Sequence, residues 1–191
     1  MATRVIGLAG RPGCGKSAVA RALAGRRNVE AIDLDRVAWE TYVPETPTYD
    51  RLVTRFGHAI LSEDGRIDRE KLASFSLSDA AARRDLEAIV HPAVSDRLDE
   101  LRRSADERGT EVLFVEGALL ASSPHVDRSI FDAVVWLEAS DETRRNRLRS
   151  DGREEHADRM DGVCPDGATI VVDAEGTLSE VVESVWRSIE R

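Results

Sequence analysis

The stretch VIGLAGRPGCGKSAV, residues 5–19, decides the fold class. Its apolar start has the character of a short buried strand, and its end has the composition of a helix. Between the two, the segment from Gly10 to Ser17 matches the P-loop pattern Gly-x-x-x-x-Gly-Lys-Ser residue for residue. A glycine-rich turn between a strand and a helix is the context in which this pattern binds nucleotide phosphates, so we predict such a site here.

The chemistry of phosphate binding explains the residue types in this turn. Glycines let main-chain N–H groups approach phosphate oxygens closely, and the following helix adds the positive end of its dipole. Lys16 can reach the β- and γ-phosphates, and the Ser17 hydroxyl can bind Mg²⁺, so ATP and Mg²⁺ are the expected ligands. The predicted nucleotide-binding residues are Gly10, Gly13, Cys14, Gly15, Lys16, Ser17 and Ala18. The alternative is a glycine-rich turn with a surface lysine.

Composition limits the class of protein. The chain has 191 residues, of which 41% are hydrophobic, and this suits one globular domain. A formal net charge of −9 argues against a nucleic-acid-binding surface, and no apolar run has the length of a membrane span. The N-terminus begins a strand at once and lacks a secretory apolar segment. A disulfide at Cys14 would obstruct the phosphate site, so we expect a reducing, cytoplasmic setting.

Further apolar runs predict the remaining strands. They occupy residues 29–34, 112–115, 133–137 and 168–172, in addition to 5–8. Near-continuous apolar runs suit parallel strands covered on both faces, and the helices between them suit right-handed crossovers. The predicted fold is α/β, a three-layer P-loop fold with a five-stranded parallel sheet. We expect the strand at 29–34 to lie beside the strand that leads into the P-loop.

Residues 36–108 show no convincing strand and read as a helical block. Asp68 and Ser78 are expected to cap helices, and apolar residues recur at helical spacing from Leu86 to Leu101. Pro92 falls inside that stripe and predicts a break or kink between two helices near His91. We therefore predict that this block is an inserted substrate-side domain (about 37–108).

Two helices follow in the C-terminal half. Ser140 is expected to cap a helix, and Thr177 with Glu180 fits a capping box for the last one. The first of these helices carries Arg144, Arg145, Arg147 and Arg149. Guanidinium groups stay charged at any working pH and suit transferring phosphates, but acidic residues are interleaved with them. We expect one or two of these arginines to meet phosphate and the others to be solvated.

Carboxylates at predicted strand ends are the candidates for catalysis and metal binding. Phosphoryl transfer to an alcohol needs a carboxylate that positions the hydroxyl and accepts its proton. Asp33 and Asp35 are two residues apart, so on a strand they would share a face overlooking the ligand crevice. Asp35 lies further out and is the expected substrate contact, whereas the alternative for either aspartate is a helix cap. Glu116 can hold Mg²⁺ or a substrate hydroxyl, and its alternative is a surface turn.

Two further polar residues have weaker signals. Asp173 follows the last predicted strand, where a loop can contact the adenine ring of a nucleotide. His91 stands in a helical stripe before Pro92, and a lone histidine there is more often structural than a ligand contact.

Several segments together resemble the dephospho-coenzyme A kinase family over nearly the whole chain. Residues 32–35, IDLD, are similar to its I-D-A-D segment after the P-loop. Residues 56–72, FGHAILSEDGRIDREKL, resemble its FG..IL..DG.LDR..L signature, and residues 86–92, LEAIVHP, resemble its L..I.HP element. The last two signatures are more specific than a P-loop.

The resemblance implies ATP-dependent phosphorylation of the ribose 3′-hydroxyl of dephospho-CoA to give CoA. It also implies a single P-loop kinase domain with a nucleotide-kinase-like core (1–36, 109–150 and 168–191), a helical CoA-side insertion (about 37–108) and a short lid (about 151–167). Carried over by position, Asp35 matches the catalytic aspartate, Lys16 the P-loop lysine and Arg147 an arginine in the helix that leads into the lid. His91 becomes a substrate-side residue, together with Asp33, Asp35 and Glu116, and Ser17 and Glu116 are the expected metal ligands.

The chain departs from the family pattern at several positions. Arg11 and Pro12 stand where the family has Gly and Ile, and Trp39 replaces an arginine. Ser122 stands where a glutamate is expected, Asp173 replaces an asparagine, and the lid is short. Two other functions therefore stay open. One is a kinase for another small alcohol, such as shikimate or a nucleoside, and the other is a non-catalytic ATP-binding relative.

Overall fold

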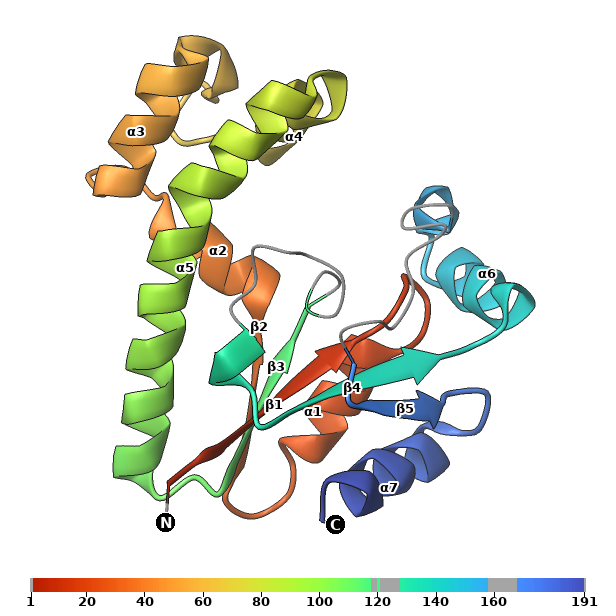
Figure 1. Ribbon diagram of the computed structural model, residues 1–191. Coiled ribbons are helices and arrows are strands. Elements are labelled where there is room, and N and C mark those ends of the chain that lie inside the picture. Colours follow the sequence, from red (N-terminus) through yellow and green to blue (C-terminus); the bar gives the residue numbers. More distant parts are fainter. Residues whose placement is uncertain (1, 118–119, 121–127, 158–167, 191) are drawn as a thin grey trace. The chain divides into compact units, whose positions relative to one another are not determined.

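A computed structural model describes residues 2–117, 120, 128–157 and 168–190. Contacts within the chain group it into two compact units (Figure 1). The core unit comprises Met1–Asp33 and Arg102–Arg191, and the helical unit comprises Leu34–Leu101.

A five-stranded parallel sheet forms the centre of the core unit. Its strands are β1 (Arg4–Ala9), β2 (Val29–Asp33), β3 (Val112–Glu116), β4 (Ala133–Glu138) and β5 (Ile170–Asp173). The strand order is β2-β3-β1-β4-β5, and every neighbouring pair is parallel. The predicted five-stranded parallel sheet is confirmed. The prediction that β2 lies beside β1 is wrong, because β3 lies between them. The pairs that β3 forms join residues more than 80 positions apart, so no local pattern in the sequence indicates them.

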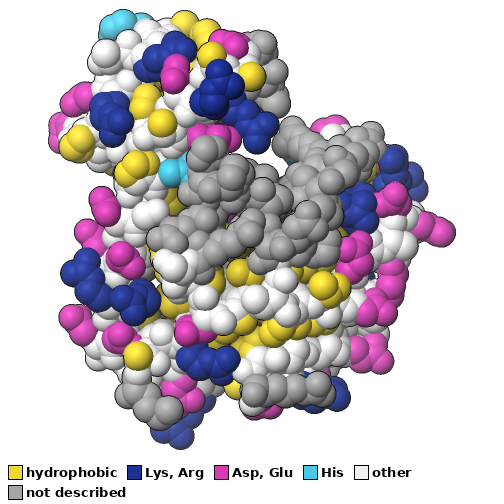
Figure 2. All heavy atoms as spheres, viewed as in Figure 1, with side chains coloured by type: hydrophobic (Ala, Val, Ile, Leu, Met, Phe, Trp, Pro, Cys, Tyr) yellow, Lys and Arg dark blue, Asp and Glu magenta, His cyan; other side chains and the backbone are white. Residues whose placement is uncertain are grey.

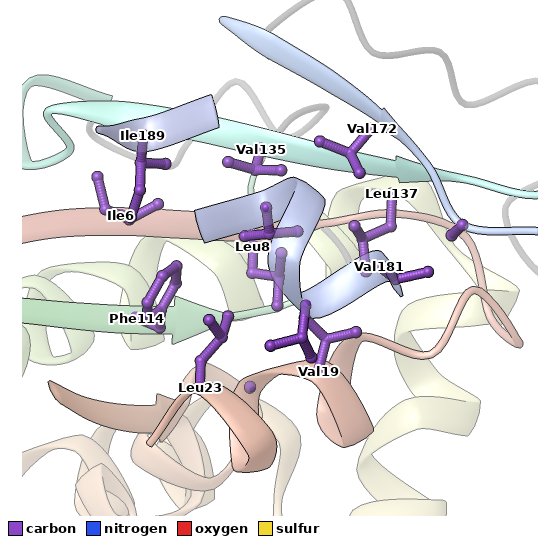
Figure 3. Packing of buried hydrophobic residues seen from close by; sticks show 14 of the residues in the cluster. Ile6, Leu8, Val19, Leu23, Phe114, Val135, Leu137, Val172, Val181 and Ile189 are labelled. Atoms are coloured by element: carbon purple, nitrogen blue, oxygen red, sulfur yellow. The ribbon is translucent and has the colours of Figure 1, made fainter. Parts of the chain in front are cut away.

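Alternate residues of the strands build the main hydrophobic core. Ile6 and Leu8 of β1 lie on the same face as Phe114 of β3 and Leu137 of β4, as side chains two apart on a strand must (Figure 3). Two helices cover this face, α1 (Lys16–Leu23) and α7 (Leu178–Ile189), and they also contact each other. The opposite face is buried as well, since β3 is enclosed along four of its five residues. A strand buried on both faces is held rigidly, and this fixes where its carboxyl end points.

Local capping signals in the core unit behave as the sequence predicts. Helix α6 (Asp141–Ser150) begins after Ser140, whose hydroxyl accepts a hydrogen bond from the Thr143 N–H at 3.2 Å. Helix α7 begins after Thr177, and both hydrogen bonds of its capping box with Glu180 are present. These caps satisfy N–H groups that the helices cannot bond internally, so both helix starts are well defined.

The helical unit is built from four α-helices. They are α2 (Leu34–Thr41), α3 (Pro47–Phe56), α4 (Arg69–Ser78) and α5 (Ala80–Arg108), the last of which continues into the core unit. Short 3₁₀ turns occur at η1 (His58–Ile60) here and at η2 (Arg128–Ile130) and η3 (Glu154–His156) in the core unit. Leu52, Ile60 and Leu72 belong to a separate hydrophobic core of this unit. The helical block is thus packed around apolar contacts of its own.

Two helix predictions in this unit need correction. Asp68 caps α4 as expected, but α5 is capped by Asp79, which accepts hydrogen bonds from the Ala81 and Ala82 N–H groups at 2.9 and 3.3 Å. Ser78 instead ends α4. Pro92 does not separate two helices, because α5 is continuous from Ala80 to Arg108. Proline removes one backbone hydrogen bond, and a helix of 29 residues retains enough others to continue through it.

Charged side chains of both signs are interspersed on the face of the molecule drawn in Figure 2. Among the described residues, the structure contains no helix with the length and apolar character that crossing a membrane requires.

Candidate active site

The loop between β1 and α1 can be built only from glycine at two positions. Gly10 has φ +147° and Gly13 has φ +84°, values that side-chain-bearing residues rarely adopt. Space is also lacking, since an added Cβ would lie 2.7 Å from the Leu137 carbonyl oxygen at Gly10 and 2.6 Å from the Arg144 carbonyl oxygen at Gly13. The loop therefore rests directly on the backbones of β4 and α6, and its shape follows theirs.

Lys16 begins helix α1 and folds back over the loop. Gly15 precedes it in a left-handed conformation with φ 92°, and this turns the chain into the helix. The Lys16 Nζ donates hydrogen bonds to the carbonyl oxygens of Gly10 and Arg11, at 2.8 and 3.3 Å. The N–H groups of Ser17 and Ala18 belong to the first turn, where no preceding carbonyl of the helix is available. The lysine ammonium group, the main-chain amides of the glycine-rich loop and the N-terminus of α1 thus lie together, as phosphate binding requires.

Ser17 and Glu116 come together at the carboxyl edge of the sheet. The Ser17 hydroxyl donates to the Glu116 carboxylate at 2.7 Å, although 99 positions separate the two residues. Glu116 ends β3 and is in register with Leu8 on β1 and with Asp33 on β2. A hydroxyl and carboxylates are the oxygen donors that Mg²⁺ accepts, usually together with water, so these residues fit a magnesium ion. No group of three or more His, Cys, Asp or Glu arranged for metal binding occurs within the described ranges.

Helix α6 presents two of its four predicted arginines to the loop. The Arg147 Nη1 donates to the Cys14 carbonyl at 3.4 Å, and its Nη2 donates to the Ala174 carbonyl at 2.9 Å. Arg144 is 1% exposed and donates to the Pro12 carbonyl at 3.0 Å. Arg149 pairs with Glu154 at 2.7 Å. Spacing of three residues places Arg144 and Arg147 on the same helix face, which explains why these two reach the loop.

A pocket of about 680 Å³ opens beside the loop in the core unit. It lies at the carboxyl ends of β4 and β5, and its walls include Arg11, Glu138, Asp141 and Asp173. Asp173 is the last residue of β5, which begins two residues later and ends one residue later than the predicted strand at 168–172. Its carboxylate accepts a hydrogen bond from the Glu175 N–H at 2.8 Å. Asp173 therefore lines this pocket while also shaping the turn that follows the strand.

Cys14 is buried inside the loop. Burial raises the pKa of its thiol, and nearby Lys16 and Arg144 oppose this only in part. The side chain is consequently a neutral thiol at ordinary pH, so the peptide groups of Cys14 rather than its sulfur are available to a phosphate.

Asp35 occupies a different position from the predicted one. Strand β2 ends at Asp33 and helix α2 begins at Leu34, so Asp33 and Asp35 do not share a strand face. Asp35 lies in the first turn of α2, where the helix dipole favours a negative charge. Burial, together with the nearby Asp35 carboxylate, raises the pKa of Tyr42 to about 12 despite the opposing effect of Arg69.

Of the other predicted substrate-side residues, His91 belongs to the helical unit, whereas Asp33 and Glu116 belong to the core unit. His91 lies within α5 and is half-buried. Trp39 of α2 is 38% exposed, and the Arg69 guanidinium lies over its ring at 3.6 Å from the centroid. The arginine of the FG..DG.IDR segment is thus held by an aromatic face, a contact that is favourable electrostatically.

Comparison with known proteins identifies the relationship. The dephospho-CoA kinase family model matches residues 4–162. A dephospho-CoA kinase from Geobacter sulfurreducens is 37% identical over 196 positions, covering 95% of this chain and 96% of that protein. One from Thermobifida fusca is 33% identical and covers 97% of this chain and 96% of that protein.

The chain belongs to the dephospho-CoA kinase family.

Solved structures share the fold. A Thermus thermophilus protein matches all of this chain and 97% of its own, with a TM-score of 0.79 and 28% identity. A dephospho-CoA kinase from Campylobacter jejuni matches 97% of this chain and 95% of its own, with a TM-score of 0.64 and 16% identity, so that likeness shows the fold alone. The resemblance inferred from the sequence and the predicted fold class are both confirmed.

Sequence reasoning missed the role of two arginines in this member of the dephospho-CoA kinase family. Arg11, within the loop, pairs with Glu138 and Asp141 at 3.0 and 3.1 Å. Among the four arginines of α6 only Arg147 was singled out from the sequence, whereas burial and the hydrogen bond to the Pro12 carbonyl distinguish Arg144. The departure from glycine at Arg11 was a signal, but its partners lie on β4 and α6 and are invisible to local sequence. Residues 158–167 of the predicted lid (about 151–167) lie outside the described residues, and so does Ser122.

Proposed function

We infer that this chain is a dephospho-CoA kinase, which transfers the γ-phosphoryl group of ATP to the ribose 3′-hydroxyl of dephospho-CoA. The observation that carries the inference is the loop geometry, with Lys16 over the glycine peptides and Ser17 on Glu116, in a chain that matches dephospho-CoA kinases over almost its full length. The products are CoA and ADP. A reducing, cytoplasmic setting is part of the proposal.

The core unit binds the phosphate donor in this proposal. Main-chain N–H groups from Gly10 to Ala18 surround the phosphates, and Lys16 exchanges its loop carbonyls for phosphate oxygens. Ser17 and Glu116 hold Mg²⁺, which when bound neutralises negative charge on the phosphates. The pocket beside Asp173 receives the adenine ring.

Asp35 and its neighbours in the helical unit act on the acceptor. Asp35 orients the 3′-hydroxyl and accepts its proton as the new phosphate–oxygen bond forms and the bond to ADP breaks. Its exposed position at the start of α2 leaves the carboxylate accessible to a substrate. Asp33 and His91 contribute to acceptor binding, and Arg147 supplies positive charge to the phosphates.

An ADP-release assay with alternative acceptors tests the reaction. Dephospho-CoA is expected to be turned over, whereas shikimate and nucleosides are not. Turnover of another alcohol without turnover of dephospho-CoA would reject the acceptor, and ATP binding with no turnover of any acceptor would identify a non-catalytic protein.

Asp35→Asn tests the proton acceptor. We expect turnover to fall by a factor of about 100 or more while ATP affinity stays close to wild type, because an amide cannot accept the proton. Asp50→Asn, on the first turn of α3, is the matched control and is expected to retain activity. Wild-type turnover in Asp35→Asn would remove Asp35 from this role.

Glu116→Gln tests the metal site. Loss of one carboxylate is expected to raise the Mg²⁺ concentration needed for half-maximal activity, with recovery at high Mg²⁺. An unchanged Mg²⁺ requirement would exclude Glu116 as a metal ligand.

A further inference from the structure

Arg144 is the most deeply buried charged side chain among the described residues. Its Nη1 donates to the carbonyl oxygens of Pro12 and Ala157, at 3.0 and 3.2 Å, and its Nη2 donates to Asp141 at 2.8 Å. The Asp141 carboxylate also pairs with Arg11, a residue of the loop, and Arg11 pairs with Glu138 as well. The P-loop is therefore fastened to α6 and β4 by charged groups at Arg11 and at Arg144.

The contact with Pro12 determines the direction of a loop peptide. The chain contains no cis peptide bond among its described residues, and in a trans peptide the C=O and N–H groups point in opposite directions. With the Pro12 carbonyl held on Arg144, the Gly13 N–H must point away from the Arg144 guanidinium. Arg147 holds the Cys14 carbonyl in the same manner, and this aims the Gly15 N–H. Phosphate oxygens are bound by such N–H groups, so the two arginines orient the groups that a phosphate meets.

The chemistry of the site argues against a purely space-filling role for Arg144. Its Nε is buried and has no hydrogen-bond partner among the described residues, which is an unfavourable arrangement for a guanidinium. An apolar side chain of similar volume would fill the same space without that cost and can even stabilise a protein. The carbonyl contact with the loop is what such a replacement would lose.

We propose that Arg144 is a positioning residue that holds the P-loop in the conformation that accepts the β-phosphate of the nucleotide. It acts through the Pro12 peptide and does not touch the substrate. The proposal rests on the nucleotide site of the proposed function, but it is independent of which alcohol accepts the phosphate.

Nucleotide binding to Arg144→Met, measured by calorimetry, tests this role. The affinity for ADP is expected to fall about tenfold or more. The variant loses a charge-assisted hydrogen bond that orients a main-chain N–H group toward a phosphate. AMP, measured by competition, lacks the β-phosphate and is expected to bind as it does to the wild type. Arg145→Met is the matched control, since Arg145 is its exposed neighbour on α6, and it is expected to bind ADP normally.

A second variant, and a melting curve that shows whether each variant is folded, make the test decisive. Arg144→Lys keeps the charge but cannot supply the planar pair of donors, so its ADP affinity is expected to lie between those of wild type and Arg144→Met. If Arg144→Met does not fold, Arg144→Lys decides the matter by the same comparison of ADP with AMP. Wild-type ADP affinity in a folded variant, or equal losses for ADP and AMP, would overturn the proposal. Failure to phosphorylate dephospho-CoA would instead count against the proposed function, because these binding measurements contain no acceptor.

Discussion

Lys16 shows how one side chain serves two states of a binding loop. Its ammonium group donates to the carbonyls of Gly10 and Arg11, and these neutral acceptors hold the side chain over the loop. A phosphate is a stronger acceptor because it is charged, so the same donors can be transferred to it without moving the helix that carries the lysine. The loop is thereby prepared for a phosphate before one arrives.

Lys16→Met is expected to lower kcat by a factor of about 100 or more, since it removes a positive charge aimed at the transferring phosphate. Steady-state kinetics with ATP and dephospho-CoA measure the effect. A second test uses amine acylation and mass spectrometry, in which ATP is expected to protect Lys16.

The sequence provides a matched control for both measurements, because Lys71 is its other lysine. Lys71 donates to the Leu61 carbonyl at 2.6 Å within the helical unit. Lys71→Met is expected to retain kcat, and acylation of Lys71 is expected to be insensitive to ATP. Equal protection of both lysines, or normal kcat in Lys16→Met, would contradict the assignment.

At the level of elements, a charged contact joins strand β2 to the end of helix α5. The Glu30 carboxylate accepts from Arg108 at 3.0 and 2.6 Å and also from the Thr110 hydroxyl. The hydrogen bond from Arg108 is the main cause that holds the pKa of Glu30 below its ordinary value of 4.5, and Thr110 contributes in the same direction. This contact attaches an edge strand of the sheet to a helix that is distant in sequence.

Glu30→Gln is expected to lower stability near neutral pH and to have little effect in acid. Because the folded pKa lies below the unfolded one, the stabilisation is fully present above about pH 4.5 and is lost as the pH falls through the lower folded value. The pair is partly exposed, so solvent screening limits the loss at pH 7 to about 1 kcal/mol or less.

Urea unfolding of wild type and Glu30→Gln at neutral pH and near pH 3 measures the difference. Glu142→Gln, an exposed position on α6, is the control for a general charge effect. A difference between Glu30→Gln and wild type that stays constant or grows in acid would show that the ion pair is not its source.

At the scale of the whole molecule, the two units have separate hydrophobic cores. The core unit packs its sheet against α1 and α7, whereas Leu52, Phe56 and Ile60 belong to the core of the helical unit. No described residue appears in both of these clusters. Damage to one core should therefore be felt first in its own unit.

Leu52→Ala tests this separation. Leu52 is fully buried, and its truncation is expected to destabilise the helical unit by about 2–5 kcal/mol. Hydrogen exchange should accelerate across residues 34–101, while the affinity for ADP remains close to wild type.

Leu23→Ala is the reciprocal variant, because Leu23 is equally buried but is the last residue of α1, the helix that follows the P-loop. It is expected to accelerate exchange in the core unit and to weaken ADP binding. A uniform increase in exchange over both units in either variant would show that the molecule unfolds as one cooperative body.

The sequence by itself determined the features that depend on neighbouring residues. The P-loop spacing, the five strands and the caps at Asp68, Ser140 and Thr177 were predictable, because turn geometry, side-chain alternation and capping act over a few positions. The signatures around residues 56–72 and 86–92 also indicated the family, which the comparisons confirm.

Only the tertiary structure decided the relations between distant segments. It placed β3 between β1 and β2, joined Ser17 to Glu116, and selected Arg144 and Arg147 from four arginines of one helix. Strand order depends on which pairings bury the most apolar surface in the complete chain, and the choice among arginines depends on which helix face meets the loop. The buried apolar surface and the helix face that meets the loop are both defined only in the folded chain, so no local sequence pattern could indicate them.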